Sequence, residues 1–159
     1  MTRFYEDVEL GRRIELGSHK FTRDEIIAFA ERFDPQPFHL DEEAAKASLF
    51  GGLSASGWHT ACIWMRLMTE YEQRLREDLV TAGLPAFGFG VSPGIRDLTW
   101  PRPVFVDDVV TYTTQPQEKR PLGSRPQWGL LVNLNEGFNQ RGEPVLRFIG
   151  NLFVERREG

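Results

Sequence analysis

The chain has 159 residues, of which 40% are hydrophobic and 26% charged, a composition typical of ordinary soluble globular proteins and not of disordered or fibrous ones. This length fits one core, so residues 1–159 are interpreted as a single domain. A net charge of -4 provides no general attraction to nucleic acid or to an anionic membrane surface, and neither is expected as a partner.

Three features indicate the compartment. One cysteine, Cys62, allows neither an internal disulfide nor a cysteine metal cluster. Residues 1–7 contain no apolar stretch that could act as a signal peptide. The uncharged residues 47–65 include too many serines and glycines for a membrane-spanning helix. We therefore expect a cytoplasmic protein.

The first elements are a strand and a helix. Residues 13–21 alternate loosely between apolar and polar, which indicates a strand. Thr22 and Glu25 then form the pattern of a capping box at the start of a helix. This helix should end near Phe33, because a residue before a proline is disfavoured in the helical conformation. A second, short helix is expected over residues 41–47.

A long helix dominates the middle of the chain. Apolar residues recur at steps of three and four between Gly57 and Leu79, with no proline or internal glycine. Its first half is apolar almost all round, as for a helix surrounded by other structure. Cys62 and Trp64 are therefore predicted to be core residues, and His59 a packed or interface histidine.

Strands fill the C-terminal half. Residues 95–106 form a predicted strand broken by two prolines, and residues 109–114 a second strand after a turn. Residues 128–138 and 145–154 fit an antiparallel hairpin. A long helix followed by such strands predicts an α+β fold, with an antiparallel sheet folded around the helix.

Residues 115–126 contain three prolines and are predicted to be a loop. The preferred interpretation is a solvated connection between strands. The alternative is a loop that presents Lys119, Arg120 and Arg125 to a phosphate. Arg102 likewise either reaches a phosphate or lies solvated at a strand edge.

The segment FDPQPFHLD holds the strongest candidates for chemistry. Asp34 and His39 lie five residues apart, and Pro35 and Pro37 restrict the backbone between them. Soon afterwards Gly57 opens the long helix, whose free N–H groups could face the same point. An acid, an imidazole and a helix N-terminus suit a reaction in which an oxygen becomes negative. The three histidines show no ligand spacing, so no metal site is expected.

Residues 25–65 resemble the MaoC-type (R)-specific enoyl-CoA hydratase family, whose signature is approximately F-A-x-x-x-x-D-x-N-P-x-H-x-D, followed by a helix and then x-H-G-M at the start of a long central helix. The residues that match it in register are Phe29, Ala30, Asp34, Pro37, His39, Asp41 and Gly57. The resemblance implies a hot-dog fold, an antiparallel sheet wrapped around one long helix. It also implies a homodimer or higher homo-oligomer with sites near the subunit boundary.

The resemblance also implies that the protein acts in fatty acid metabolism and that particular residues carry out the reaction. Asp34 and His39 would hold a water and remove its proton as it attacks a trans-2-enoyl-CoA thioester. The backbone N–H of Gly57 would stabilise the thioester oxygen. The coenzyme A thioester is the substrate, and no metal or redox cofactor is needed.

Several positions depart from the family pattern. Gln36 replaces the asparagine, Ser56-Gly57-Trp58 replaces H-G-M, Met65 replaces a small hydroxyl residue, and Asp107 replaces a glycine. We take Gln36, Ser56, Gly57 and Trp58 as candidate oxyanion or substrate-binding residues. Two other functions stay open, an acyl-CoA thioesterase and a non-catalytic acyl-CoA-binding protein.

Overall fold

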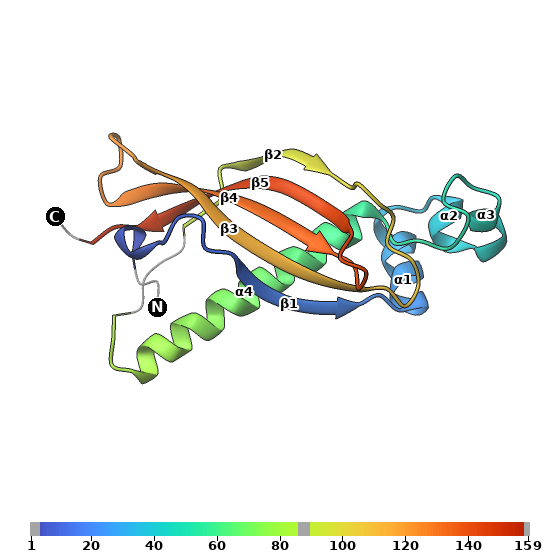
Figure 1. The fold of residues 1–159 in the computed structure, drawn as a ribbon, viewed down its shortest axis with the longest axis horizontal. Helices are drawn as coiled ribbons and strands as arrows, with labels where there is room; N and C mark the ends of the chain where they lie inside the picture. The colour runs from blue at the N-terminus through green and yellow to red at the C-terminus, as the bar shows by residue number, and fades with distance from the viewer. Residues whose placement is uncertain (1–3, 86–89, 158–159) are drawn as a thin grey trace.

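The computed structural model describes residues 4–85 and 90–157. Five strands form one antiparallel sheet in the order β1-β3-β4-β5-β2. The strands are β1 (Ile14–Lys20), β2 (Gly94–Thr99), β3 (Val109–Pro121), β4 (Trp128–Phe138) and β5 (Pro144–Glu155). The helical elements are η1 (Tyr5–Asp7), α1 (Arg23–Phe33), α2 (Pro37–Leu40), α3 (Glu42–Lys46) and α4 (Gly57–Thr81). The sheet runs along α4, and α1, α2 and α3 gather at one end of the molecule (Figure 1).

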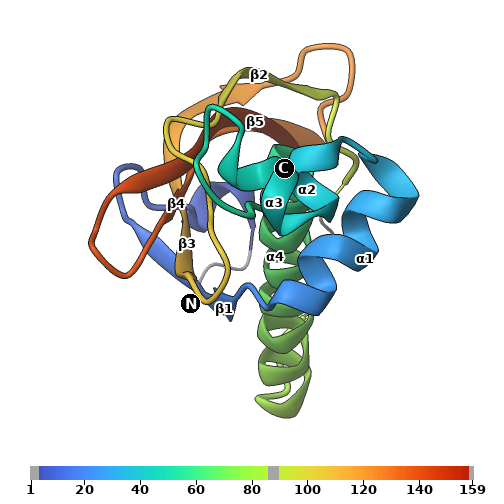
Figure 2. The same ribbon diagram turned by 90° about the vertical axis from the view of Figure 1, so that its right-hand side faces the viewer.

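The sheet curves around α4, as Figure 2 shows from the end where the short helices lie. The side of α4 that faces the sheet is buried, and it includes Ile63, Trp64 and Leu67. The Trp64 indole packs edge to face on Phe148, with ring centroids 4.7 Å apart. Burial of such apolar surface is the main force that holds a sheet to a helix.

Cys62 is exposed, so its predicted place in the core is wrong. The reason is the direction of its side chain on α4. Trp58 and Met65 share its face of the helix, and both are more than half exposed, at 55% and 54%. Trp64 and His59, in contrast, are buried as predicted.

The helix boundaries agree with the capping signals. The hydroxyl of Thr22 accepts a hydrogen bond from the Glu25 N–H at 3.4 Å, and α1 ends at Phe33 as expected. Helix α4 begins at Gly57 and extends two residues beyond the predicted end. Helix α2 was not predicted. Pro37 lies in its first turn, where the missing N–H of a proline costs nothing, and this turn contains His39.

The predicted loop over residues 115–126 is wrong for most of its length. Strand β3 continues to Pro121, which pairs with Gly129 of β4. Strand β1 pairs with β3 only as far as Thr114, so beyond that point β3 is an edge strand and tolerates prolines. Lys119 is not presented to a phosphate, because its Nζ donates to the backbone carbonyls of Tyr5, Glu6 and Val8.

Strand β2 is shorter than predicted and ends at Thr99. The prolines that follow keep the chain out of the sheet, and Phe105 instead forms an isolated antiparallel bridge with Ser54, outside the strands of the sheet. The expected turn after it is present, and Asp107 adopts a positive φ of 67° there. Within residues 4–85 and 90–157, no helix has the length and apolar character needed to cross a membrane.

Candidate active site

Asp34 sits where α1 ends. Its backbone N–H donates to the Ala30 carbonyl at 2.9 Å, which fixes the carboxylate just past the last helical turn. Gln36 donates from Nε2 to Asp34 Oδ1 at 2.7 Å, and the Ser56 hydroxyl hydrogen-bonds the same carboxylate. Burial alone would raise the pKa of Asp34. The hydrogen bonds from Ser56 and Gln36 outweigh it, with a smaller contribution from His39 whenever that ring is protonated, so the pKa is lowered and the group is ionised at neutral pH.

His39 is buried and oriented from behind. Its Nδ1 lies 2.7 Å from the backbone carbonyl of Ser54. Because a carbonyl can only accept, Nδ1 carries the hydrogen and the neutral ring leaves Nε2 as a proton acceptor. That Nε2 lies 3.5 Å from Asp34 Oδ2. A water beside this gap can donate one hydrogen to each acceptor, which leaves its oxygen free to attack.

Gly57 forms the third part of the site. Ser56 caps α4, its hydroxyl accepting from the Trp58 N–H at 3.2 Å. The N–H of Gly57 belongs to the first turn, where helices leave donors without intrahelical partners, and none of the described residues accepts from it. A Cβ at this position would lie 2.5 Å from the Trp100 indole, so the close contact requires glycine.

A cavity of about 370 Å³ joins His39 to Gly57. Its other lining residues are Phe50, Ser54, Ala55, Thr60, Trp100, Pro101, Arg102, Pro103, Val104 and Val145. Asp34 lies at its edge through the contact with His39, and its side chain is 19% exposed. The cavity has room for a small acyl group beside an imidazole and an unpaired amide hydrogen.

The candidate residues therefore divide into two groups. Asp34, His39, Ser56 and Gly57 come together, and Gln36 supports Asp34 from the exposed side. Trp58 does not line the cavity, although its ring packs against that of Trp100, with the ring centroids 5.3 Å apart. Arg102 lines the cavity, but its side chain is half exposed and lies 3.5 Å from Glu143.

Sequence reasoning missed Phe50 and Trp100, which line the cavity from loops. No periodicity links Trp100 to Gly57, because the contact arises only when the segment after β2 folds over the start of α4. The neighbouring Pro101 and Pro103, which exclude this segment from the sheet, are the nearest signal in the sequence.

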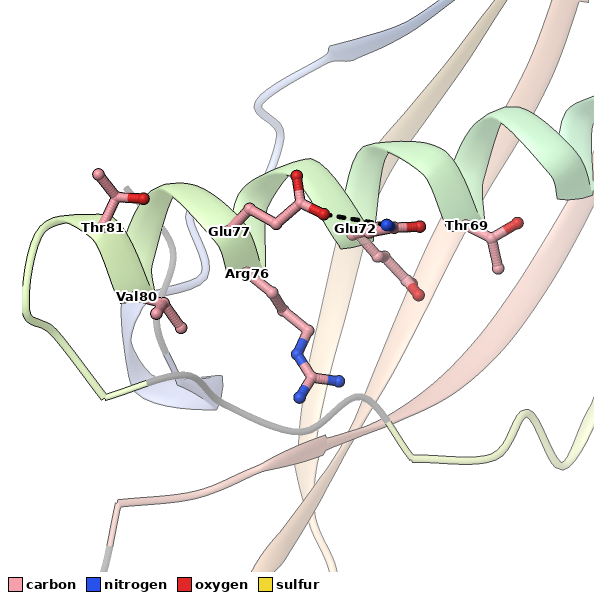
Figure 3. A pocket seen from close by; sticks show the side chains of 7 residues that line it. Thr69, Glu72, Arg76, Glu77, Val80 and Thr81 are labelled. Carbon is pink, nitrogen blue, oxygen red and sulfur yellow. Dashed lines mark hydrogen bonds between the residues drawn. The ribbon is translucent and has the colours of Figure 1, made fainter.

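Another hollow, of about 680 Å³, lies along the C-terminal half of α4, and the described residues that line it all belong to this helix. Figure 3 shows Glu72, Arg76 and Val80 along one side of the helix, with Glu77 on another. None of the candidate residues lines it. Within the described part of the chain, no group of three or more His, Cys, Asp or Glu residues is placed to hold a metal ion.

An antiparallel sheet wrapped around one long helix, with an acid–imidazole pair beside the start of that helix, defines a hot-dog protein with a candidate acid–base site. The family model described as "MaoC like domain" matches residues 7–127. The chain belongs to this MaoC-like family, and the predicted hot-dog fold is confirmed.

Known proteins similar to the chain include one sequence and two solved structures. The uncharacterized protein YdeM of Bacillus subtilis is 31% identical over 149 residues, which cover 94% of this chain and 95% of YdeM. A MaoC-like dehydratase from Rhodospirillum rubrum is 42% identical with a TM-score of 0.80, covering 98% of this chain and 99% of that one. An (R)-hydratase from A. caviae, involved in PHA biosynthesis, is 25% identical with a TM-score of 0.63, covering 94% and 98%.

Proposed function

We propose that the protein is a cytoplasmic (R)-specific enoyl-CoA hydratase, or 3-hydroxyacyl-CoA dehydratase in the reverse direction. The observation that carries the proposal is the pair of acceptors His39 Nε2 and Asp34 Oδ2, 3.5 Å apart. The similarity to a MaoC-like dehydratase and to an (R)-hydratase supports the same class of reaction.

In the proposed reaction, Asp34 and His39 each accept a hydrogen bond from one water. The water oxygen attacks the β-carbon of the enoyl thioester while one O–H bond breaks, and its proton passes to the pair. The electrons of the double bond move toward the thioester, whose oxygen becomes negative and is stabilised by the Gly57 N–H. The pair then returns the proton to the α-carbon, so no other reactant is needed.

The remaining candidates have supporting roles in this scheme. Gln36 and Ser56 hold the Asp34 carboxylate and keep it ionised. The Ser54 carbonyl keeps His39 in the tautomer that accepts a proton at Nε2. Trp58 supports the Trp100 indole, which forms part of the cavity wall.

The test follows the loss of enoyl-thioester absorbance with a short trans-2-enoyl-CoA and purified protein. Asp34→Asn should lower kcat by about a hundredfold or more, because the pair then loses a proton acceptor. Asp41→Asn is the matched control. Asp41 belongs to the same segment but caps α3 through the Ala44 N–H, a task that asparagine performs equally well.

An Asp34→Asn variant with the full rate of the wild type would overturn the assignment. Measurement of free thiol in the same reactions separates hydration from the alternative thioesterase activity. Thermal stabilisation by acyl-CoA without any turnover would instead indicate the non-catalytic binding protein.

We also propose that the protein forms a homodimer. Strand β2 is an edge of the sheet, and Trp58, Cys62 and Met65 form an exposed, largely apolar face on α4. Unpaired strand edges and exposed apolar faces are surfaces that a second copy can cover. Light scattering should give the mass of a dimer for the wild type, and Met65→Glu should shift it toward the monomer. A monomeric wild type would contradict this proposal.

A further inference from the structure

A second cavity, of about 310 Å³, borders α4 further along the helix than the candidate active site, and the described residues that line the two cavities do not overlap. The residues that line it include Trp64, Met65 and Met68 of α4, Asn133 and Asn135 of β4, and Phe148 of β5. The near end is apolar. The far end, against β4 and β5, contains three asparagine side chains.

Both cavities border α4 and β5. Thr60 lines the first and Trp64 the second, one helical turn further along α4. Strand β5 contributes Val145 to the first and Phe148 to the second. From Thr60 to Met68 is eight residues, or about 12 Å along the helix axis. An acyl chain whose thioester lies at Gly57 would extend along α4 toward the second cavity.

The floor of this cavity is built from amides. Asn135 is 1% exposed and both polar atoms of its amide have a partner: its Oδ1 accepts from the Thr114 hydroxyl at 2.7 Å and its Nδ2 donates to the Asn133 carbonyl at 3.3 Å. Gly150 provides the room for it, since a Cβ there would lie 2.8 Å from Asn135 Nδ2. The amide of Asn135 is therefore part of the framework and not free for a ligand.

Asn133 is different. Its side chain is buried, with the residue 7% exposed, and it lines the cavity. No described residue hydrogen-bonds its side-chain amide. The amide atoms of Asn133 are not among the described side-chain atoms that are fully buried without a partner, so they are accessible from the cavity to water or to a ligand. A hydrocarbon chain that filled the cavity would displace water from this amide without replacing its hydrogen bonds.

The charge of the lining residues limits the chemical classes of ligand that the cavity can bind. Among the described residues that line the cavity, Glu72 is the only ionisable one. A carboxylate on the ligand would meet no cation there and would be repelled by an ionised Glu72. A hydroxyl or carbonyl oxygen meets neither penalty and can accept a hydrogen bond from Asn133.

We infer that the preferred substrates are acyl thioesters whose chain carries an uncharged oxygen, a hydroxyl or carbonyl, in its distal part, hydrogen-bonded by the Asn133 amide. The inference rests on the proposed function and specifies the substrate class of that site. Discrimination comes from the buried amide, because a plain alkyl chain would leave it without a partner.

The experiment compares trans-2-enoyl-CoA substrates of equal chain length that end in either a methyl or a hydroxymethyl group. The wild type should favour the hydroxylated chain by about tenfold in kcat/KM at the best length. Asn133→Leu should remove or reverse this preference. Met68→Leu is the matched control, since it alters an apolar side chain of the same cavity and should keep the preference.

Equal kcat/KM values for the two substrates with the wild type would overturn the inference and leave the hydratase function intact. If neither substrate is hydrated, the proposed function fails. Calorimetric binding of the corresponding saturated acyl-CoA pair then decides the inference, with tighter binding of the hydroxylated chain expected for the wild type and not for Asn133→Leu. Asn133→Val replaces the leucine variant if that protein does not fold, because valine suits a strand.

Discussion

His39 Nε2 and Asp34 Oδ2 lie 3.5 Å apart, and each group is fixed by a contact on its far side. The Ser54 carbonyl holds His39 through Nδ1, and Gln36 holds Asp34 through Oδ1. His39 Nδ1 and Asp34 Oδ1 are thus occupied, and Nε2 and Oδ2 are the atoms of the pair that face each other. This arrangement places the free acceptors toward each other, where one water can bridge them.

Ser56 links the acid to the start of α4, because its hydroxyl contacts Asp34 and also accepts from the Trp58 N–H. Ser56→Ala should lower the free energy of unfolding by about 1 kcal/mol through loss of the cap. It should also raise the pKa of Asp34, so that activity declines at a higher pH on the acid side. Ser56→Thr keeps the hydroxyl, so it should retain most of the wild-type stability and most of the wild-type activity on the acid side. Urea unfolding and a pH–rate profile measure the two effects, and an unchanged acid limb in Ser56→Ala would contradict the link.

Gly57 is predicted to be intolerant of any side chain, because a Cβ would meet the Trp100 ring at 2.5 Å. Gly57→Ala should displace the indole, change the tryptophan fluorescence and lower kcat/KM by about tenfold or more through misplacement of the N–H. Trp100→Ala removes the obstacle, so the double variant should lose less activity than the sum of the two single changes predicts. Additive losses would show that Trp100 is not the constraint on residue 57.

The sequence predicted the elements that have a local cause. The capping residue Thr22 and the proline after Asp34 determine where α1 begins and ends, and the uninterrupted helical pattern determines α4. The pair Asp34 and His39 could also be predicted, since both lie in one short segment restrained by prolines.

The misses depend on neighbours that are distant in sequence. Pro116 and Pro121 lie in a strand because β1 stops pairing at Thr114, which no local pattern reveals. Cys62 is exposed because the sheet covers only part of α4. The first half of this helix is apolar on almost all sides, but only the side toward the sheet is buried. The contact of Trp100 with Gly57 and the free amide of Asn133 likewise exist only in the folded chain.

Acid lability is expected from His59. Burial lowers its pKa to about 4, with His19 and Arg66 adding to the effect and Glu25 opposing it. The unfolded chain, with a pKa near 6.5, therefore binds this proton more readily than the folded protein. Stability is lost as the pH falls from about 6.5 to about 4, by as much as about 3 kcal/mol from this one group.

His59→Phe tests this contribution. The ring would keep its stacking on Phe29, whose centroid lies 4.5 Å away, and the substitution removes the buried, unpartnered Nδ1. The variant should retain the wild-type free energy of unfolding at pH 7 and lose less of it at pH 4.5, as measured by urea unfolding. Some acid sensitivity should remain, because the pKa of Glu25, raised by burial, is lowered overall by its hydrogen bond with His19. If the variant lost as much free energy of unfolding between pH 7 and pH 4.5 as the wild type, the acid lability would arise from groups other than His59.

Glu72 should have the opposite pH dependence. Burial raises its pKa to about 7, against 4.5 for an ordinary glutamate, so folding favours its protonated form. The penalty grows as the pH rises from about 4.5 to about 7 and is then complete. Glu72→Gln should therefore raise the free energy of unfolding at pH 8 by about 1–2 kcal/mol, a range reduced for partial exposure, and leave it unchanged at pH 4. Glu77→Gln removes the same charge from the exposed part of α4 and serves as the control. A gain of equal size at pH 4 and pH 8 would show that the benefit does not come from the charge of Glu72.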